Sequence, residues 1–226
     1  DVSIDELMDY SMMIVDATKD LTSAYKPNLA FFEEWGSKGF YWLESLISHI
    51  GDEHIIIADA KRGDIGNTGL HYANAFFNHF RCDAITVSPY MGKESIEPFI
   101  TDSSKGTFVL CRTSNESSTF IQEDIFSKVI SVCEQLNDKQ NIGLVVGATN
   151  DEALKDVRNL SDLPFLIPGI GAQGGSLENV LKINENHLDT TLINISRGII
   201  FAGNKDHDSI RSKTNDYLSQ MRGFNG

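Results

Sequence analysis

Short runs of apolar and β-branched residues alternate with amphipathic stretches along the whole chain. This alternation is typical of a parallel sheet, because neighbouring parallel strands need a long crossover and a helix usually supplies it. Two of the runs, 54–58 and 143–147, are apolar on both sides of the strand, as expected where helices cover one face and a packed core the other. The sequence predicts seven strands, and they are 24–32, 54–60, 84–88, 107–112, 143–147, 165–168 and 191–195.

Helical periodicity and capping residues place helices between these strands. A long helix is expected over 5–21, and two others over 39–50 and 177–183, led by Ser37 and Ser176. We therefore predict an α/β fold, a (β/α)8 TIM barrel, as a single domain over residues 1–226. Seven strands are one short of that barrel, and the chain begins with a helix and no initiator Met. We expect the first strand to be absent from this sequence and the domain to be N-terminally incomplete.

Charge and composition exclude several classes of function. The formal net charge of -13 argues against nucleic-acid binding, which depends on a basic surface. No apolar run reaches the roughly 20 residues that span a bilayer, and the N-terminus lacks the layout of a signal peptide. We expect a cytoplasmic protein with no membrane partner. Its three cysteines, Cys82, Cys111 and Cys133, have no metal-ligand spacing and are expected to be small buried side chains.

The segment 59–68, Asp-Ala-Lys-Arg-Gly-Asp-Ile-Gly-Asn-Thr, directly follows an apolar strand. Asp59 and Lys61 are two residues apart and point to the same side of that strand, while Asp64 follows in the loop. Carboxylates on both sides favour the protonated lysine, which makes Lys61 a candidate proton donor. Lys26, with Asn28 on the same face, lies on the preceding strand and extends this into an array of alternating charge. A structural ion-pair network is the alternative.

Two further segments follow late strands and suit a phosphate. Residues 168–175, Pro-Gly-Ile-Gly-Ala-Gln-Gly-Gly, allow close backbone approach and precede a helix, although a tight turn would explain them too. Arg197 and Gly198 end the last strand, where barrels frequently bind phosphate. Thr113, Ser114 and Asn115 follow another strand and could face a base or an amide, or could form an ordinary turn.

These segments resemble the orotidine 5′-phosphate decarboxylase family, in family order over nearly the whole chain. The resemblance rests on 24–32, 59–68, 87–92, 113–115, 145–149, 168–173 and 196–198. It implies that Lys61 protonates C6 of the pyrimidine, that Asp59 lies against the departing carboxylate, and that Lys26 and Asp64 hold the charged network. It implies no metal and no organic cofactor. Family members usually carry a first strand ending in Gly-Leu-Asp, which this sequence lacks.

The resemblance also implies how the substrate is held. The substrate-binding positions that it suggests are Asn28, Ile65, Thr68, Thr113, Ser114, Pro168, Gln173, Arg197 and Gly198. Within this set, Gln173 and Arg197 match phosphate contacts, and Thr113 and Ser114 match the segment that faces the pyrimidine amide. Family members are homodimers with shared active sites, in which the positions of Asp64, Ile65 and Thr68 reach the neighbouring subunit.

Two other functions remain open on the sequence. Relatives that share Asp-x-Lys-x-x-Asp on the same barrel act on sugar phosphates with a divalent metal, as decarboxylases or aldolases. A non-catalytic nucleotide-binding barrel is the second alternative, because a fold alone does not establish a function. The long 59–68 segment and Thr113-Ser114-Asn115 favour the pyrimidine enzyme over the first. The complete set of charged residues favours an enzyme over the second.

Overall fold

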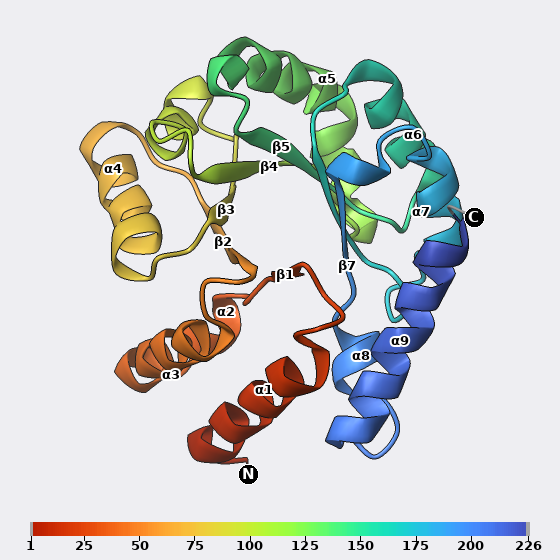
Figure 1. Cartoon of the computed structure of the whole chain (residues 1–226). Coiled ribbons are helices and arrows are strands. Elements are labelled where there is room, and N and C mark those ends of the chain that lie inside the picture. Colours follow the sequence, from red (N-terminus) through yellow and green to blue (C-terminus); the bar gives the residue numbers. More distant parts are fainter. Residues whose placement is uncertain (1, 225–226) are drawn as a thin grey trace.

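A computed structural model describes residues 2–224 and contains one curled sheet of seven parallel strands (Figure 1). The strands are β1 (Ala24–Tyr25), β2 (Ile55–Arg62), β3 (Ala84–Val87), β4 (Gly106–Arg112), β5 (Ile142–Val146), β6 (Phe165–Pro168) and β7 (Thr191–Asn194). Each strand pairs in parallel with the next one along the chain, so their carboxyl ends form a single rim.

Helices form the outer layer around this sheet (Figure 1). The α-helices are α1 (Ile4–Thr18), α2 (Ala30–Glu33), α3 (Gly36–Ile50), α4 (Gly66–Asn74), α5 (Thr119–Leu136), α6 (Asp151–Leu160), α7 (Leu177–Ile183), α8 (Arg197–Ile200) and α9 (His207–Phe224). Shorter turns are the π-helical η1 (Ala75–His79) and the 3-10 helices η2 (Lys93–Ser95), η3 (Glu97–Phe99), η4 (Glu116–Ser118), η5 (Asn137–Lys139) and η6 (Leu188–Thr190). With its repeating strand and helix units, the chain has the architecture of a (β/α)8 barrel.

The core has two parts, one on each side of the sheet. Inside the curl, one buried residue from each of five strands packs into a single cluster of Ile57, Ala84, Phe108, Val145 and Leu166. A larger cluster lies between the strands and the helices. Most central strand residues are therefore buried whichever way they point, which explains the continuous apolar runs in the sequence.

The structure corrects the predicted ends of one strand and one helix. The strand expected over 24–32 ends at Tyr25 and continues only as a bridge between Asn28 and Asp59, and the chain then turns into α2. The first helix ends at Thr18, because the chain turns there with Leu21 N–H donating to the Thr18 carbonyl.

The predicted N-cap Ser37 is wrong, whereas Ser176 is confirmed. α3 already begins at Gly36, after Trp35, so Ser37 lies within its first turn. The reason is that α2 leads almost directly into α3, and Glu34 between them is itself in helical conformation. Ser176 accepts a hydrogen bond from the backbone N–H of Asn179 and caps α7 as expected.

Within the described residues, the sheet has one opening, between β1 and β7. The helical layer is continuous at this point, because α1 packs against α9 and Arg211 forms a bidentate ion pair with Asp20. A cavity of about 300 Å³ lies beneath these helices and is lined by both edge strands. The helical layer of the barrel is thus closed at this point, whereas the sheet is open between β1 and β7.

Two further expectations concern burial and hydropathy. All three cysteines are free and buried, as predicted. Burial raises the pKa of each thiol to about 12. Over residues 2–224, no helix combines the length and the apolar character needed to cross a bilayer.

Candidate active site

Asp59 lies at the centre of a charged cluster at the carboxyl rim of the sheet. Four apolar or small residues, 55–58, carry β2 through the core and deliver Asp59 to the rim, where it is 9% exposed. Its carboxylate accepts hydrogen bonds from Lys26 Nζ at 2.7 Å on Oδ2 and from Lys61 Nζ at 2.5 Å on Oδ1. The structure therefore joins the three residues in one hydrogen-bonded cluster, as the sequence predicts.

The Lys26 side chain is held in place by the pairing of its segment with β2. Asp59 N–H donates to the Pro27 carbonyl, and Leu29 N–H donates to the Asp59 carbonyl. Asn28, which lies between them, bridges Asp59 and caps its own turn by accepting from Ala30 N–H. This short pairing replaces the longer strand expected from the sequence and still aligns Lys26 with Asp59.

The two lysines differ in exposure. The Lys26 side chain is 11% exposed, and burial lowers its pKa against the opposing attraction of Asp59. The Lys61 side chain is 49% exposed. Burial alone would raise the pKa of Asp59, but Lys26 and Lys61 together lower it below its ordinary value. Asp59 is therefore ionised at neutral pH, and Lys61 is the cation of the cluster that a ligand at the rim can reach.

Sequence reasoning missed Thr86, a buried residue of β3 whose hydroxyl lies next to both Asp59 and Lys61. The Lys61 backbone next to it is also unusual, because its φ is 48° and only four non-glycine residues in residues 2–224 have a positive φ. Thr86 itself gives no signal in the sequence, because threonine is common in strands. Only the pairing of β2 with β3 reveals this contact.

Asp64 does not join the cluster within a single chain. Its carboxylate accepts from the N–H of Ile65, and no hydrogen bond or ion pair connects it to Lys26 or Lys61 in the part of the chain that is described. Ile65 and Thr68 are both exposed on the same loop and the start of α4. Within one chain, the structure therefore brings together three of the four residues of the expected array, Lys26, Asp59 and Lys61, but not Asp64.

Two further strand ends, those of β4 and β6, meet at the rim. Ser114, after β4, donates a hydrogen bond to the side chain of Gln173, after β6, at 2.8 Å. Thr113 is held to α5 by Gln122, which accepts from its N–H and donates to its hydroxyl. The segments predicted to face a base and a phosphate therefore touch each other.

The segment that follows β6 consists of tight turns. Gly169, Gly171 and Gly174 all have positive φ, which explains why glycine occupies these positions. Pro168 begins this turn at the end of β6, and its carbonyl accepts from the N–H of Ala148.

Arg197 and Gly198 follow β7, which ends at Asn194, and they begin α8 rather than ending the strand as expected. Arg197 is exposed, and no salt bridge to it is found within residues 2–224. Gly198 packs so close to α9 that a Cβ there would lie 2.9 Å from the hydroxyl of Tyr217. A side chain at this position would therefore require the Tyr217 side chain to move.

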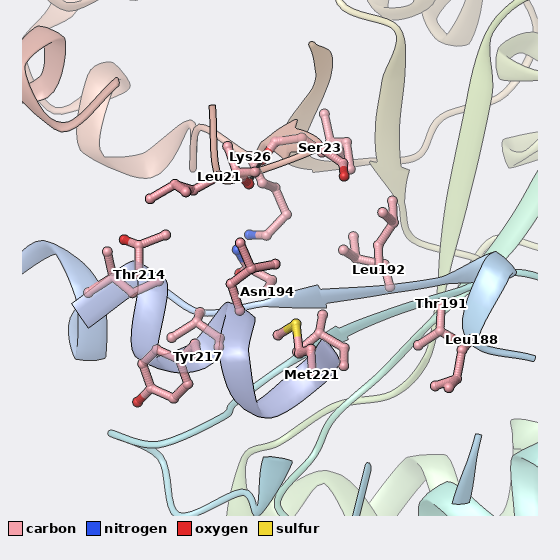
Figure 2. Close-up of a pocket in the computed structure, with 18 of the residues that line it drawn as sticks. Leu21, Ser23, Lys26, Leu188, Thr191, Leu192, Asn194, Thr214, Tyr217 and Met221 are labelled. Carbon is pink, nitrogen blue, oxygen red and sulfur yellow. Dashed lines mark hydrogen bonds between the residues drawn. The ribbon is translucent and has the colours of Figure 1, made fainter. Parts of the chain in front are cut away.

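The cavity between β1 and β7 reaches the charged cluster from the side (Figure 2). Figure 2 shows Lys26 and Asn194 extending into it from opposite walls, while Leu21, Leu192 and Met221 line it with apolar groups. Lys26 therefore has Asp59 on one side and a largely apolar space on the other.

No group of three or more His, Cys, Asp or Glu side chains that could hold a metal ion occurs in residues 2–224. The charged groups gathered at the rim are instead two ammonium groups and one carboxylate.

The fold and this cluster at the carboxyl ends of the strands define a (β/α)-barrel enzyme. The sequence model of the orotidine 5′-phosphate decarboxylase / HUMPS family matches residues 2–209. The chain belongs to this family.

Individual relatives agree with this assignment. The orotidine 5′-phosphate decarboxylase of Flavobacterium johnsoniae is 44% identical over 228 residues, which is 96% of this chain and 80% of that protein. The solved structure of Leishmania donovani OMP decarboxylase is 34% identical with a TM-score of 0.90, covering 99% of this chain and 90% of that one. That of Leishmania donovani UMP synthase is 36% identical with a TM-score of 0.92, and this chain spans 51% of it.

Proposed function

We propose that the chain catalyses the decarboxylation of orotidine 5′-monophosphate to uridine 5′-monophosphate, in de novo pyrimidine biosynthesis, with Lys61 as the proton donor. The bond between C6 and the carboxylate breaks, CO2 leaves, and the electron pair remaining at C6 takes a proton from the Lys61 ammonium. The observation that carries this proposal is Asp59, held ionised between Lys26 and Lys61 at the carboxyl rim.

The different exposures of the two lysines support separate roles. Lys61 is half exposed, so a ligand at the rim can reach its ammonium, whereas Lys26 is buried behind the carboxylate. An ammonium fixed next to C6 stabilises the developing negative charge before it transfers its proton. Asp59 would lie near the substrate carboxylate and orient Lys61, and Lys26 would keep Asp59 ionised.

The remaining rim segments would bind the rest of the nucleotide. Thr113 and Ser114 would face the pyrimidine amide, and the Ser114 contact with Gln173 would connect that segment to the phosphate site. Arg197 is exposed at the start of α8 and would grip the phosphate together with Gln173. Pro168, Gly198 and Asn28 would shape the walls of the site. Binding energy from the phosphate can hold the site closed around the reacting carbon.

The active unit would be a homodimer in which each subunit completes the other's site. Large apolar side chains are exposed near the loop that carries Asp64: Ile65 is 52% exposed, Leu70 46%, Tyr90 81% and Met91 50%. Three of them, Ile65, Leu70 and Met91, line one shallow groove. Such a patch on a soluble barrel favours association, and Asp64, free of its own lysines, could then reach the partner's Lys61.

A further parallel strand would complete the barrel between β1 and β7. The cavity there is lined by both edge strands and lies under a closed helical layer. Backbone groups at a strand edge need hydrogen-bond partners when they are buried. A segment that pairs with both β1 and β7 should therefore raise the Tm, and an unchanged Tm would count against this arrangement.

The cellular setting would be the cytoplasm. Three free, buried cysteines are in keeping with a reducing compartment, and the net charge of -13 leaves a nucleotide rather than a nucleic acid as the ligand.

The loss of orotidine 5′-monophosphate absorbance, measured with and without EDTA, tests the reaction. Equal turnover in both samples is expected, because the proposed chemistry uses only side chains. Loss of activity in EDTA that returns with a divalent metal would favour a metal-dependent relative of the same barrel. Nucleotide binding without turnover would favour a non-catalytic barrel.

A further inference from the structure

The hydroxyl of Thr86 lies between two groups of β2, the carboxylate of Asp59 and the backbone N–H of Lys61. Thr86 belongs to β3 and is 1% exposed. Its Oγ1 lies 3.0 Å from the backbone nitrogen of Lys61 and 3.1 Å from Oδ1 of Asp59. The same Oδ1 accepts the Lys61 ammonium. One buried hydroxyl thus contacts both the carboxylate and the backbone of the lysine.

Chemistry fixes the direction of both hydrogen bonds. The Lys61 N–H can only donate, so the Thr86 oxygen accepts from it. The ionised Asp59 carboxylate can only accept, so the single hydroxyl proton is donated to it. Only a side chain that donates and accepts at once can satisfy both neighbours, and valine, which has the same shape, satisfies neither.

This hydroxyl replaces a backbone partner where β2 bulges away from β3. The strands pair at Ala58 with Ile85 and again at Arg62 with Val87. Between these two pairs, β2 therefore advances by four residues and β3 by two. Lys61 lies inside this bulge in a left-handed conformation that lysine rarely adopts. Its N–H has the Thr86 hydroxyl as a partner in place of a β3 carbonyl. Bulges near active sites re-aim side chains, and this one directs Lys61 back over Asp59.

We propose that Thr86 is a positioning residue for the reaction, which holds Lys61 and Asp59 in their mutual orientation by bonding the backbone of one and the carboxylate of the other. The inference rests on the roles proposed for Asp59 and Lys61. Thr86 is 1% exposed, so a ligand at the rim should not touch it, and its loss should affect turnover more than binding.

Thr86→Val removes the hydroxyl and keeps the shape, and Thr86→Ser keeps the hydroxyl. Because misplacement of a reacting group by about 1 Å can cost about a hundredfold, we expect Thr86→Val to lower kcat by about 10- to 100-fold. KM should stay within about threefold, and Thr86→Ser should recover kcat to within about threefold of the wild type. If Thr86→Val does not fold, Thr86→Ala takes its place in the same comparison.

Thr107→Val is the matched control. Thr107 is an equally buried strand threonine, 1% exposed, whose hydroxyl donates to the Phe99 carbonyl at 2.9 Å, near the amino end of β4. It should lose stability in the same way as Thr86→Val but keep its kcat, with all rates normalised to sites that bind uridine 5′-monophosphate.

Three results would overturn the role of Thr86: a Thr86→Val kcat within twofold of wild type, a serine variant as slow as valine, or an equal loss in Thr107→Val. Lys61→Ala in the same assay distinguishes a failure of the role of Thr86 from a failure of the roles proposed for Asp59 and Lys61. If Lys61→Ala is inactive and Thr86→Val is fully active, only the role of Thr86 fails. If Lys61→Ala is active, the proposed roles of the cluster fail.

Discussion

Lys61 Nζ lies 2.5 Å from Asp59 Oδ1, although the lysine side chain is half exposed and the aspartate is almost completely buried. The contact therefore joins an accessible ammonium to a carboxylate that solvent barely reaches. A charge-assisted hydrogen bond in such a place is stronger than one in water. It keeps the ammonium at the rim in one position before a ligand arrives, which is the preorganisation that electrostatic catalysis requires.

Replacing Arg197 with alanine should weaken phosphate recognition. Loss of one charge-assisted contact costs about 1.5–3 kcal/mol, so kcat/KM should fall roughly tenfold to more than a hundredfold. Arg222→Ala, which removes an exposed arginine of α9, serves as the control and should leave kcat/KM unchanged. Equal values for wild type and Arg197→Ala would place the phosphate elsewhere.

Acid should weaken the cluster through Asp59. Its pKa is lowered in the folded protein, so its contribution to the free energy of unfolding is present above the unfolded pKa of about 3.9 and is lost as the pH falls through the folded value. Asp59→Asn leaves Lys26 buried without its counter-ion and should cost up to about 3–5 kcal/mol at pH 7.

The difference between wild type and Asp59→Asn should then shrink as the pH falls below about 4, because a protonated aspartate is as neutral as asparagine. Urea titrations of both proteins between pH 7 and pH 3 measure this difference directly. A constant difference over that range would mean that Asp59 is not stabilised as the anion.

The cysteines should be inert in the native protein. Burial raises the pKa of all three thiols to about 12, and only the thiolate reacts with alkylating reagents. Iodoacetamide at pH 8 should modify none of them before unfolding and all three in denaturant, as counted by mass spectrometry. Rapid modification of any one in the native state would show that the helices covering it open readily.

Mixing Asp64→Ala with Lys61→Ala should restore activity if the sites are shared. Each variant alone should be inactive. In a heterodimer, one site then combines the wild-type Lys61 of one chain with the wild-type Asp64 of the other, and complete exchange in a two-fold dimer should recover about a quarter of wild-type activity. No recovery after subunit exchange has been proven, for example by mass, would count against shared sites.

The sequence predicts the buried strands well. Strands such as β5 and β6 are short apolar runs between polar segments, which is the pattern expected of a buried strand. The predicted strand over 24–32 was too long because apolar residues such as Phe32 pack from a short helix as readily as from a strand.

The sequence predicts the members of the cluster better than their geometry. Lys26, Asp59 and Lys61 follow from their positions at strand ends. The positive φ of Lys61 does not, because that conformation signals itself in a sequence only when glycine adopts it. Thr86 could not be found either, since its role depends on the register of two strands.

The turnover of Lys61→Ala shows directly whether Lys61 is the proton donor. We predict that kcat for orotidine 5′-monophosphate falls by about 10²–10⁴-fold or more, the usual contribution of a positioned acid, while uridine 5′-monophosphate still binds, because the phosphate and pyrimidine contacts remain. A kcat close to that of the wild type would contradict the account, since it would show that C6 takes its proton from another group.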